Sequence, residues 1–256
     1  METNTKYGAL ARFYDEIMRD VDYEAWADYL DEVIQIHAPD ALTLMELATG
    51  TATIALSLDE LDCYQITASD KSAEMITVAK EKVAAQNSDI RCMVVDFLDI
   101  QLEEQFDIIL IAFDSVNYLR SESKLICLFS EVQKIMHPNS FLIFDFTTPN
   151  YSPKIEGLLN ESRSTDSGDY QRLSHYDSVS RIHTNSFRIR LKDEHGFSDV
   201  IKEDHLQRAW TLNEMESAVK KANLTILARY PDFDIGEADE NSDRITMVVQ
   251  CPQTQS

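Results

Sequence analysis

The sequence predicts an α/β protein built on a doubly wound, mostly parallel seven-stranded sheet with a small antiparallel β insertion. Over residues 42–150, short apolar runs alternate with amphipathic helices, the pattern of parallel strands covered by helices on both faces. Residues 187–192, FRIRLK, instead alternate strictly between apolar and basic side chains. Such alternation is typical of a half-exposed antiparallel strand, so the architecture changes after Pro149.

The front of the chain predicts a helical cap over residues 1–40. Residues 23–37 have the periodicity of an amphipathic helix, and Asp22 can cap its first turn. The preceding residues 7–18 are unusually aromatic for a terminal segment, which favours a packed rather than a loose structure. The apolar face of the helix carries Trp26, Leu30, Val33 and His37.

Residues 41–150 predict the core of the sheet. Two of its connecting helices have clear apolar faces, one with Met75, Ile76, Ala79 and Val83, the other with Leu125, Phe129, Val132 and Met136. Because proline cannot continue a helix, we expect the second of these helices to end at Pro138. Five parallel strands are expected at 42–47, 65–70, 90–95, 106–113 and 140–146.

We expect residues 151–209 to form the antiparallel insertion, over the open end of the main sheet. Residues 210–256 then complete the core. Thr211 and Glu214 form a capping-box sequence for a helix that ends near Asn223. The parallel pattern is expected to resume around this helix, with closing strands at 224–230 and 244–250.

Charge and cysteine content exclude several function classes. The 256-residue chain carries 23 Lys and Arg against 45 Asp and Glu, so its net charge of −22 repels polyanions and we expect no nucleic-acid partner. The four cysteines are far apart and match no disulfide framework or metal-ligand spacing. No leader pattern and no run of ~20 apolar residues occurs. We expect a cytoplasmic protein without metal or membrane partner, and leave a homodimer open.

The stretch LMELATGTATIAL, residues 44–56, has the outline of a cofactor loop. An apolar strand ends at Glu46, a tight turn with Gly50 follows, and Asp70 ends the next strand, where an acid can hold ribose hydroxyls. The glycine fingerprint of NAD proteins is absent, which disfavours a dehydrogenase. Ala48 and Ala52 are the smallest replacements for glycine, so a ligand can approach closely if neither position needs a positive φ.

Three segments in order, ELATGTA at 46–52, ASDKSAEMITVAKEK at 68–82 and VVDFLDI at 94–100, resemble the first three motifs of class I S-adenosylmethionine-dependent methyltransferases. FDIILIAFDSVNYL at 106–119 resembles the motif of the fourth strand. The resemblance covers nearly the whole chain. It implies a Rossmann-like fold that binds S-adenosylmethionine and releases S-adenosylhomocysteine.

The resemblance also implies a role for each matching residue. Glu46 lies below the loop, Ala48, Gly50 and Thr51 pass the methionine end of the cofactor, and Asp70 takes the ribose hydroxyls. The adenine is bordered by Lys71, Met75, Asp96 and Phe97, and the sulfonium by Ala112, Phe113 and Asp114. Simpler readings stay open for two of the acids, since Asp70 can cap a helix and Asp96 can merely end a strand.

Two terminal segments narrow the resemblance. Residues 13–30 and 203–224 are similar to bacterial small-molecule methyltransferases related to glycine and amino-sugar N-methyltransferases. In those proteins an aromatic N-terminal segment folds over the cofactor, where aromatic rings attract a sulfonium cation. Tyr14, Tyr23 and Trp26 are therefore candidate cofactor contacts, although Tyr14 and Trp26 can also pack against the sheet.

Four residues are candidates for catalysis. Asp114 and Tyr118 follow the fourth strand, where the acceptor must pass, although polar side chains there can also simply satisfy buried backbone groups. His205 and Arg208 lie where the insertion returns to the cofactor's open side. A regular strand points these two to opposite faces, so they act together only if the strand contains a bulge.

The sequence therefore favours an enzyme that transfers a methyl group from S-adenosylmethionine to an N or O atom of a small metabolite. Methyl transfer depends mainly on orientation, and a general base is needed only when the acceptor must lose a proton. The alternative is a non-catalytic S-adenosylmethionine-binding protein with a regulatory or interaction role. RNA modification is disfavoured by the net charge of −22.

Overall fold

The main sheet contains seven strands, and the computed structural model describes residues 8–194 and 196–252. In chain order the strands are β1 (Thr43–Leu47), β2 (Gln65–Asp70), β3 (Arg91–Val94), β4 (Phe106–Ile111), β5 (Met136–Thr147), β11 (Thr225–Pro231) and β12 (Arg244–Gln250). Their order across the sheet is β11-β12-β5-β4-β1-β2-β3. The chain leaves β1 towards β2 on one side and returns through β4 on the other, so a crevice opens beyond their carboxyl ends.

Strand direction confirms the mostly parallel sheet and corrects one detail. β1 to β5 pair in parallel, whereas β12 runs antiparallel to both β5 and β11. The expectation that the parallel pattern resumes is therefore wrong for β12. Residues 232–243 join β11 to β12 without a crossover helix, and a direct connection of this kind makes neighbouring strands antiparallel.

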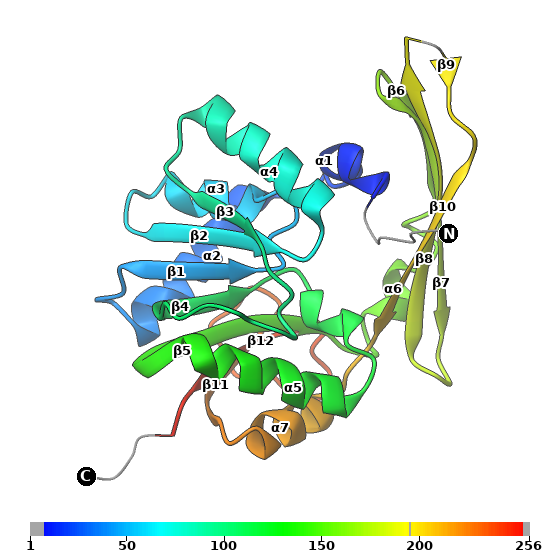
Figure 1. The fold of residues 1–256 in the computed structure, drawn as a ribbon. Helices are drawn as coiled ribbons and strands as arrows, with labels where there is room; N and C mark the ends of the chain where they lie inside the picture. Colours follow the sequence, from blue (N-terminus) through cyan, green and yellow to red (C-terminus); the bar gives the residue numbers. More distant parts are fainter. Residues whose placement is uncertain (1–7, 195, 253–256) are drawn as a thin grey trace.

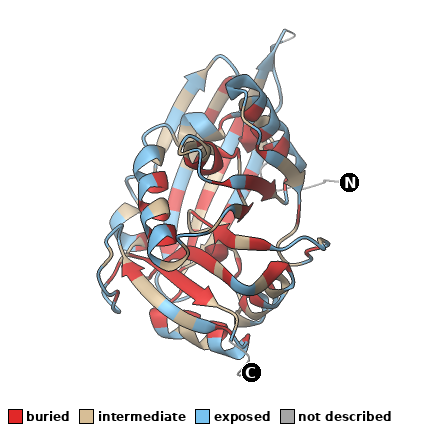
Figure 2. Cartoon of the chain, turned by 90° about the vertical axis from the view of Figure 1, so that its left-hand side faces the viewer, coloured by how far each residue is buried: buried red, intermediate tan, exposed pale blue. Residues whose placement is uncertain are grey.

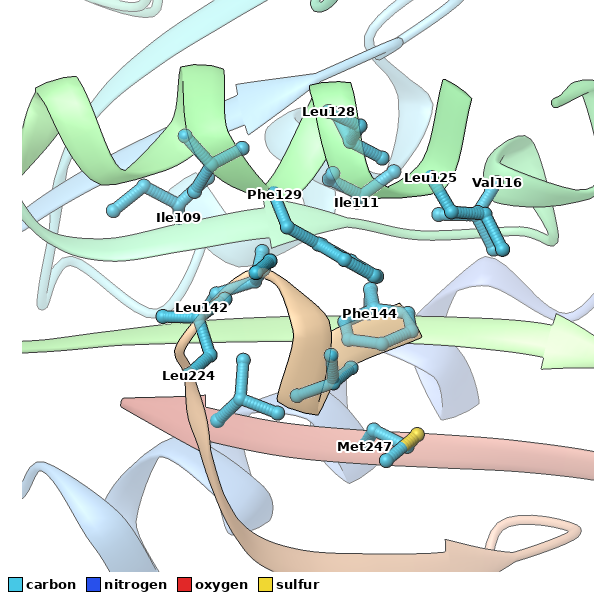
Figure 3. Close-up of a cluster of buried hydrophobic side chains, with 14 of the residues drawn as sticks. Ile109, Ile111, Val116, Leu125, Leu128, Phe129, Leu142, Phe144, Leu224 and Met247 are labelled. Atoms are coloured by element: carbon cyan, nitrogen blue, oxygen red, sulfur yellow. The ribbon is translucent and has the colours of Figure 1, made fainter. Parts of the chain in front are cut away.

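Helices cover both faces of the main sheet, as Figure 1 shows. On one face lie α2 (Tyr23–His37), α3 (Thr53–Asp59) and α4 (Ala73–Gln86); on the other lie α5 (Glu122–Val132) and α7 (Leu212–Lys221). The close-up in Figure 3 shows Leu125 and Phe129 of α5 packed with side chains of β4 and β5. Figure 2 shows the buried residues along the strands and on the inner sides of the helices.

The helix predicted before Pro138 ends earlier than expected. α5 stops at Val132, one 3-10 turn, η3 (Gln133–Ile135), follows, and Met136 already belongs to β5. The pairing of β5 with β4 shifts register between Met136 and Phe141. Pro138 thus lies where the ladder is interrupted and no backbone donor is required, which is where a strand tolerates proline.

The predicted capping residues behave as expected. Asp22 accepts the backbone N–H of Ala25 at 2.9 Å at the start of α2, and Thr211 with Glu214 forms a complete capping box at the start of α7. Asn223 follows α7 with a φ of 60°. These local interactions fix where the two helices begin.

A second sheet confirms the antiparallel insertion. Its strands are β6 (Glu161–Thr165), β7 (Gly168–Asp177), β8 (Ile182–Asp193), β9 (Gly196–Phe197) and β10 (Ile201–Arg208), and it is preceded by α6 (Ser152–Ile155). The order is β10-β8-β7-β6, with β9 paired to β8, and all pairs are antiparallel. In Figure 1 this sheet stands beside the main one.

The N-terminal segment connects the two sheets. It contains η1 (Leu10–Arg12) and α1 (Tyr14–Ile17), which Figure 1 shows between them. Leu10 and Phe13 pack against Tyr170, Phe187 and Ile189 of the second sheet. Residues 1–7 of the predicted cap lie outside the described residues, and the boundaries at 40, 150 and 209 stay predictions. Within residues 8–194 and 196–252, no helix is long and apolar enough to cross a membrane.

Candidate functional site

A cavity of about 1170 Å³ lies between the carboxyl ends of the main-sheet strands and the second sheet. Pockets for one small ligand usually measure about 300–1000 Å³, so this cavity has room for more than one. Sixteen of the eighteen predicted site residues line it: Tyr14, Tyr23, Glu46, Ala48, Gly50, Thr51, Asp70, Lys71, Met75, Asp96, Phe97, Ala112, Phe113, Asp114, Tyr118 and His205. Trp26 and Arg208 lie elsewhere.

The Glu46 side chain forms part of the floor of the cavity, behind the loop that follows β1. Its side chain is only 2% exposed and accepts a hydrogen bond from the Thr49 hydroxyl. Burial, with a smaller contribution from the charge of Asp70, raises the pKa of Glu46 to about 7. This carboxyl group therefore holds its proton to a higher pH than an exposed glutamate does.

The loop itself bends through three left-handed residues. Ala48, Gly50 and Ala52 have φ values of 59°, 58° and 61°. The sequence-based condition that neither alanine needs a positive φ is thus not met, and both adopt a conformation that disfavours any residue with a Cβ. The backbone bond from Thr49 N–H to Ser69 O, 2.8 Å, ties this bend to the end of β2.

Asp70 holds the same loop with its side chain. Its Oδ2 accepts the Gly50 N–H at 3.0 Å and its Oδ1 accepts the Ser72 N–H at 2.8 Å. Burial raises the pKa of Asp70, and these two bonds oppose that rise. The helix-cap reading does not apply, because Ser72 caps α4 by accepting the Met75 N–H at 3.2 Å.

Asp96 lies at the mouth of the cavity, beyond β3. Its carboxylate pairs with the Lys71 ammonium and accepts the Leu98 N–H at 3.0 Å. Burial alone would raise the pKa of Asp96, but Lys71 and the Leu98 N–H lower it, so the group is ionised at neutral pH. Met75 and Phe97 supply apolar surface next to this ion pair.

The aromatic front divides into two groups. Tyr14 covers the loop, since its Cε1 lies 3.7 Å from where a Cβ on Gly50 would be. Tyr23 stacks on Phe113 with 6.1 Å between ring centroids, and both line the cavity. Trp26 packs behind Phe113 at 5.2 Å and is 5% exposed. Trp26 thus takes the alternative left open for it, packing in the core rather than lining the cavity.

The N-terminal segment is also attached to the loop by polar contacts. The Asp15 carboxylate accepts a hydrogen bond from the Thr51 hydroxyl and forms an ion pair with the Lys82 ammonium at 2.9 Å. Lys82 in turn donates to the Thr53 hydroxyl at 2.7 Å. These bonds hold α1 over the opening of the loop.

The end of β4 carries two consecutive left-handed residues, Phe113 and Asp114, with φ of 62° and 50°. The Asp114 N–H donates to Asp145 Oδ2 at 2.9 Å, and its carboxylate pairs with Arg244 at 2.7 Å. Gln207 of β10 donates to the same carboxylate. Strained residues held by several bonds are common at functional sites.

Sequence reasoning missed Arg244 and Asp145, which pair directly beneath Asp114. Burial is the main reason that the pKa of Asp145 rises to about 6, although the Arg244 charge opposes it. Burial would lower the pKa of Arg244, but Asp145 and Asp114 together raise it. The available signal was one acid inside the apolar run FLIFDF and one base opening the apolar run RITMVVQ.

His205 links the second sheet to the end of β4. Its Nδ1 lies 3.5 Å from the Tyr118 hydroxyl and its Nε2 lies 3.4 Å from Glu203 Oε2. β10 pairs with β8 without a register shift, so no bulge brings Arg208 to the same face. Arg208 instead pairs with Glu214 at 2.9 Å and lies over the Trp210 ring. Arg208 and His205 thus point to opposite faces of β10, as strand parity predicts.

The inner face of the second sheet adds polar residues that sequence reasoning missed. Arg172 donates to Asn185 Oδ1 at 3.0 Å, and His183 Nε2 lies 2.6 Å from the Ser174 hydroxyl. Burial, with a smaller contribution from Arg172, lowers the pKa of His183, so its ring is neutral at pH 7. Arg172, His183 and Asn185 line the cavity opposite the loop. Only the strand register reveals which polar residues face inwards.

Comparison with known proteins adds independent evidence. The methyltransferase domain family matches residues 44–139. YqeM of Bacillus subtilis (strain 168), a protein named as a methyltransferase, is 28% identical over 254 residues, which cover 97% of this chain and 98% of YqeM. A similarly named protein of Geobacillus sp. (strain WCH70) is 24% identical over an alignment that covers 95% of this chain and 99% of that protein.

Solved structures share the fold. An S-adenosylmethionine-dependent methyltransferase from Clostridium acetobutylicum superposes with a TM-score of 0.77 at 23% identity, covering 96% of this chain and 98% of that one. CalS10, an amino pentose methyltransferase from Micromonospora echinaspora solved with bound S-adenosylmethionine, gives a TM-score of 0.69 at 16% identity, covering 98% and 100%. Both the seven-stranded core and the second sheet are included in these matches.

Proposed function

We propose that this chain, an S-adenosylmethionine-dependent methyltransferase that matches the methyltransferase domain family over residues 44–139, methylates a nitrogen or oxygen atom of a small metabolite. The bond between the Asp70 carboxylate and the Gly50 N–H carries the proposal. It brings the acid after β2 against the bend after β1, which is where a sheet of this topology binds a nucleoside.

The cofactor occupies the half of the cavity formed by the main sheet. Asp70 accepts the ribose hydroxyls, Met75 and Phe97 contact the adenine, and Lys71 with Asp96 borders it at the mouth. Glu46 supports the loop, and Ala48, Gly50 and Thr51 pass the methionine end. Tyr14, Tyr23, Ala112 and Phe113 surround the sulfonium. These roles rest on the positions of the side chains around the cavity.

The acceptor occupies the half formed by the second sheet. Arg172, His183 and Asn185 offer hydrogen-bond donors and acceptors there, and the volume left beside a cofactor suits a small molecule. The net charge of −22 opposes a nucleic-acid acceptor. Amino sugars are reasonable first acceptors to test, because the similar structures include an amino pentose methyltransferase and a sugar N-methyltransferase.

Three residues act on the acceptor. Asp114 and Tyr118 orient the reacting atom in line with the methyl group, an effect that can lower the barrier by ~7–11 kcal/mol. His205 accepts the acceptor's proton, directly or through Tyr118, when methylation requires its removal. Each of the three lines the cavity.

Titration calorimetry tests the cofactor assignment. S-adenosylhomocysteine should bind far more tightly than NAD, because the NAD fingerprint is absent while Asp70 and Gly50 are joined. Equal affinity for the two compounds, or no binding of the sulfur nucleoside, would contradict the proposal.

Turnover is tested separately with S-adenosylmethionine carrying a labelled methyl group. We expect label to appear in small amines or alcohols from a panel that includes amino sugars, and not in added RNA. His205→Asn should slow this reaction while leaving S-adenosylhomocysteine affinity unchanged. Tight cofactor binding with no transfer to any acceptor would favour the non-catalytic alternative.

A further inference from the structure

We propose that Glu203 is a positioning residue that makes the orientation of the His205 imidazole depend on closure of the N-terminal segment, residues 8–17. The inference rests on the proposed function for its catalytic meaning, since it assigns His205 to proton removal. Its structural part, a physical connection between the segment and the imidazole, stands on the geometry alone.

The Glu203 side chain connects the two through its two carboxylate oxygens. Oε1 accepts the backbone N–H groups of Ala9 at 2.8 Å and Leu10 at 3.1 Å. Oε2 lies 3.4 Å from His205 Nε2. Glu203 is 5% exposed and His205 is 2% exposed, so both interactions are shielded from water. Shielding strengthens such bonds and makes their loss costly.

The connection continues into the cavity. His205 Nδ1 lies 3.5 Å from the Tyr118 hydroxyl, and the rings of Tyr118 and Phe187 meet the imidazole edge-on at 6.2 and 5.5 Å between centroids. The imidazole is therefore clamped on its sides by two aromatic rings and at one nitrogen by the carboxylate. The N-terminal segment touches two of these contacts: its backbone N–H groups bind the carboxylate, and Leu10 and Phe13 pack against Phe187.

Contacts on both sides of the cavity hold the N-terminal segment closed. Leu10 and Phe13 pack on the apolar part of the second sheet, while Asp15 is bonded to the cofactor loop. When the segment lifts, Glu203 loses two N–H donors and water reaches its carboxylate. A hydrated carboxylate interacts more weakly with the imidazole, so His205 is oriented only while the segment covers the cavity.

This arrangement explains why a buried acid is used at this position. Burial alone would raise the pKa of Glu203, but His205 and the N–H groups of Leu10 and Ala9 hold it below the usual range. Glu203 therefore stays ionised in the closed state, with Oε1 accepting the two N–H groups and Oε2 facing the imidazole. A glutamine could accept through only one oxygen and would present an NH₂ group to its other neighbour.

The test uses the full chain without ligand and two variants. Glu203→Ala removes both carboxylate oxygens and so the connection itself, whereas Asp15→Ala releases the segment from Thr51 and Lys82 and substitutes neither Glu203 nor His205. Amide hydrogen exchange of residues 9 and 10 reports closure. The ¹⁵N signals of the His205 ring, assigned with His205→Asn, report the tautomer and surroundings of the imidazole at fixed pH.

We expect both variants to exchange the amides of residues 9 and 10 about 10-fold faster or more, and both to shift the His205 ring signals. Faster exchange in Asp15→Ala with unmoved His205 signals would overturn the proposal, and so would unchanged exchange in Glu203→Ala. If Glu203→Ala does not fold, Asp15→Ala alone decides the matter. Because neither reading needs a ligand, failure here is distinct from failure to bind S-adenosylhomocysteine.

Discussion

The Asp70 carboxylate accepts the Gly50 N–H at 3.0 Å, which ties the acid at the end of β2 to the loop that follows β1. The same carboxylate accepts the Ser72 N–H at 2.8 Å. Asp70 is therefore a partly buried structural acceptor, in addition to the role proposed for it as a ribose ligand.

Asp70→Ala should lower both cofactor affinity and stability. Loss of the acceptor leaves the N–H groups of Gly50 and Ser72 without their partner, which costs ~1–3 kcal/mol in the ligand-free protein. Affinity for S-adenosylhomocysteine should fall ~5- to 150-fold. Lys71→Ala is the control for stability alone, because an exposed ion pair contributes ~0–1 kcal/mol. Calorimetry and thermal unfolding measure both effects, and an unchanged apo Tm in Asp70→Ala would contradict the double role.

Ala48→Gly and Ala52→Gly should each stabilise the ligand-free protein. Their φ values of 59° and 61° lie in the left-handed region, where a Cβ is disfavoured. Removing that strain is worth up to ~1 kcal/mol, or ~2–4 °C in Tm for a domain of this size. Gly50→Ala is the matched control and should lower stability. The new Cβ would lie 3.7 Å from the nearest atom and would not clash, so the lost stability would come from backbone strain. Destabilisation by either glycine would disprove the strain argument.

Glu46 should make stability depend on pH. Its folded pKa is about 7 and its ordinary value is 4.5, so the folded protein holds this proton more tightly than the unfolded chain. Proton binding by Glu46 stabilises the folded protein fully below pH 4.5. As pH rises to 7, the free energy of unfolding falls by ~3 kcal/mol. Glu46→Gln should therefore exceed the parent in stability at pH 8 and approach it at pH 4, as measured by urea unfolding. A difference that is constant with pH would exclude this origin.

Arg244 should be essential for stability because of Asp145. Arg244→Met leaves the Asp145 carboxylate buried without its cation, at a cost of ~3–5 kcal/mol in the free energy of unfolding. Adding Asp145→Asn should recover part of that loss, because the more deeply buried of the two carboxylates is then neutral, while Asp114 keeps only its bond from Gln207. Chemical denaturation of the two single variants and the double variant measures the coupling, and strictly additive losses would show that the pair is not a unit.

The cofactor half of the site could be predicted because parallel topology gathers it. The carboxyl ends of neighbouring parallel strands meet at one edge, so Glu46, Asp70 and Asp96 are brought together once the strands are known. The left-handed φ of Ala48 could not be predicted, because the sequence offers no glycine there and the conformation is imposed by the turn.

The acceptor half depends on relationships that local sequence does not contain. Asp114, Asp145 and Arg244 meet because β4, β5 and β12 are neighbours, although β12 lies about a hundred residues further along the chain. Strand parity correctly separated His205 from Arg208, yet which of the two faces the cavity follows only from how the second sheet docks. Glu203 needs both this docking and the path of the N-terminal segment.

Tyr14 and Trp26 should affect ligand binding differently, because Tyr14 lines the cavity whereas Trp26 packs beneath it against Phe113. S-adenosylmethionine carries a sulfonium charge that S-adenosylhomocysteine lacks, and an aromatic face attracts a cation by ~0.5–2 kcal/mol. Tyr14→Leu should therefore weaken S-adenosylmethionine ~2- to 30-fold more than S-adenosylhomocysteine. Trp26→Phe should weaken neither selectively but should lower Tm, since it leaves space in the packing around Phe113. Calorimetric titration of both ligands into both variants decides this, and a selective loss in Trp26→Phe, or equal losses in Tyr14→Leu, would reverse the assignment.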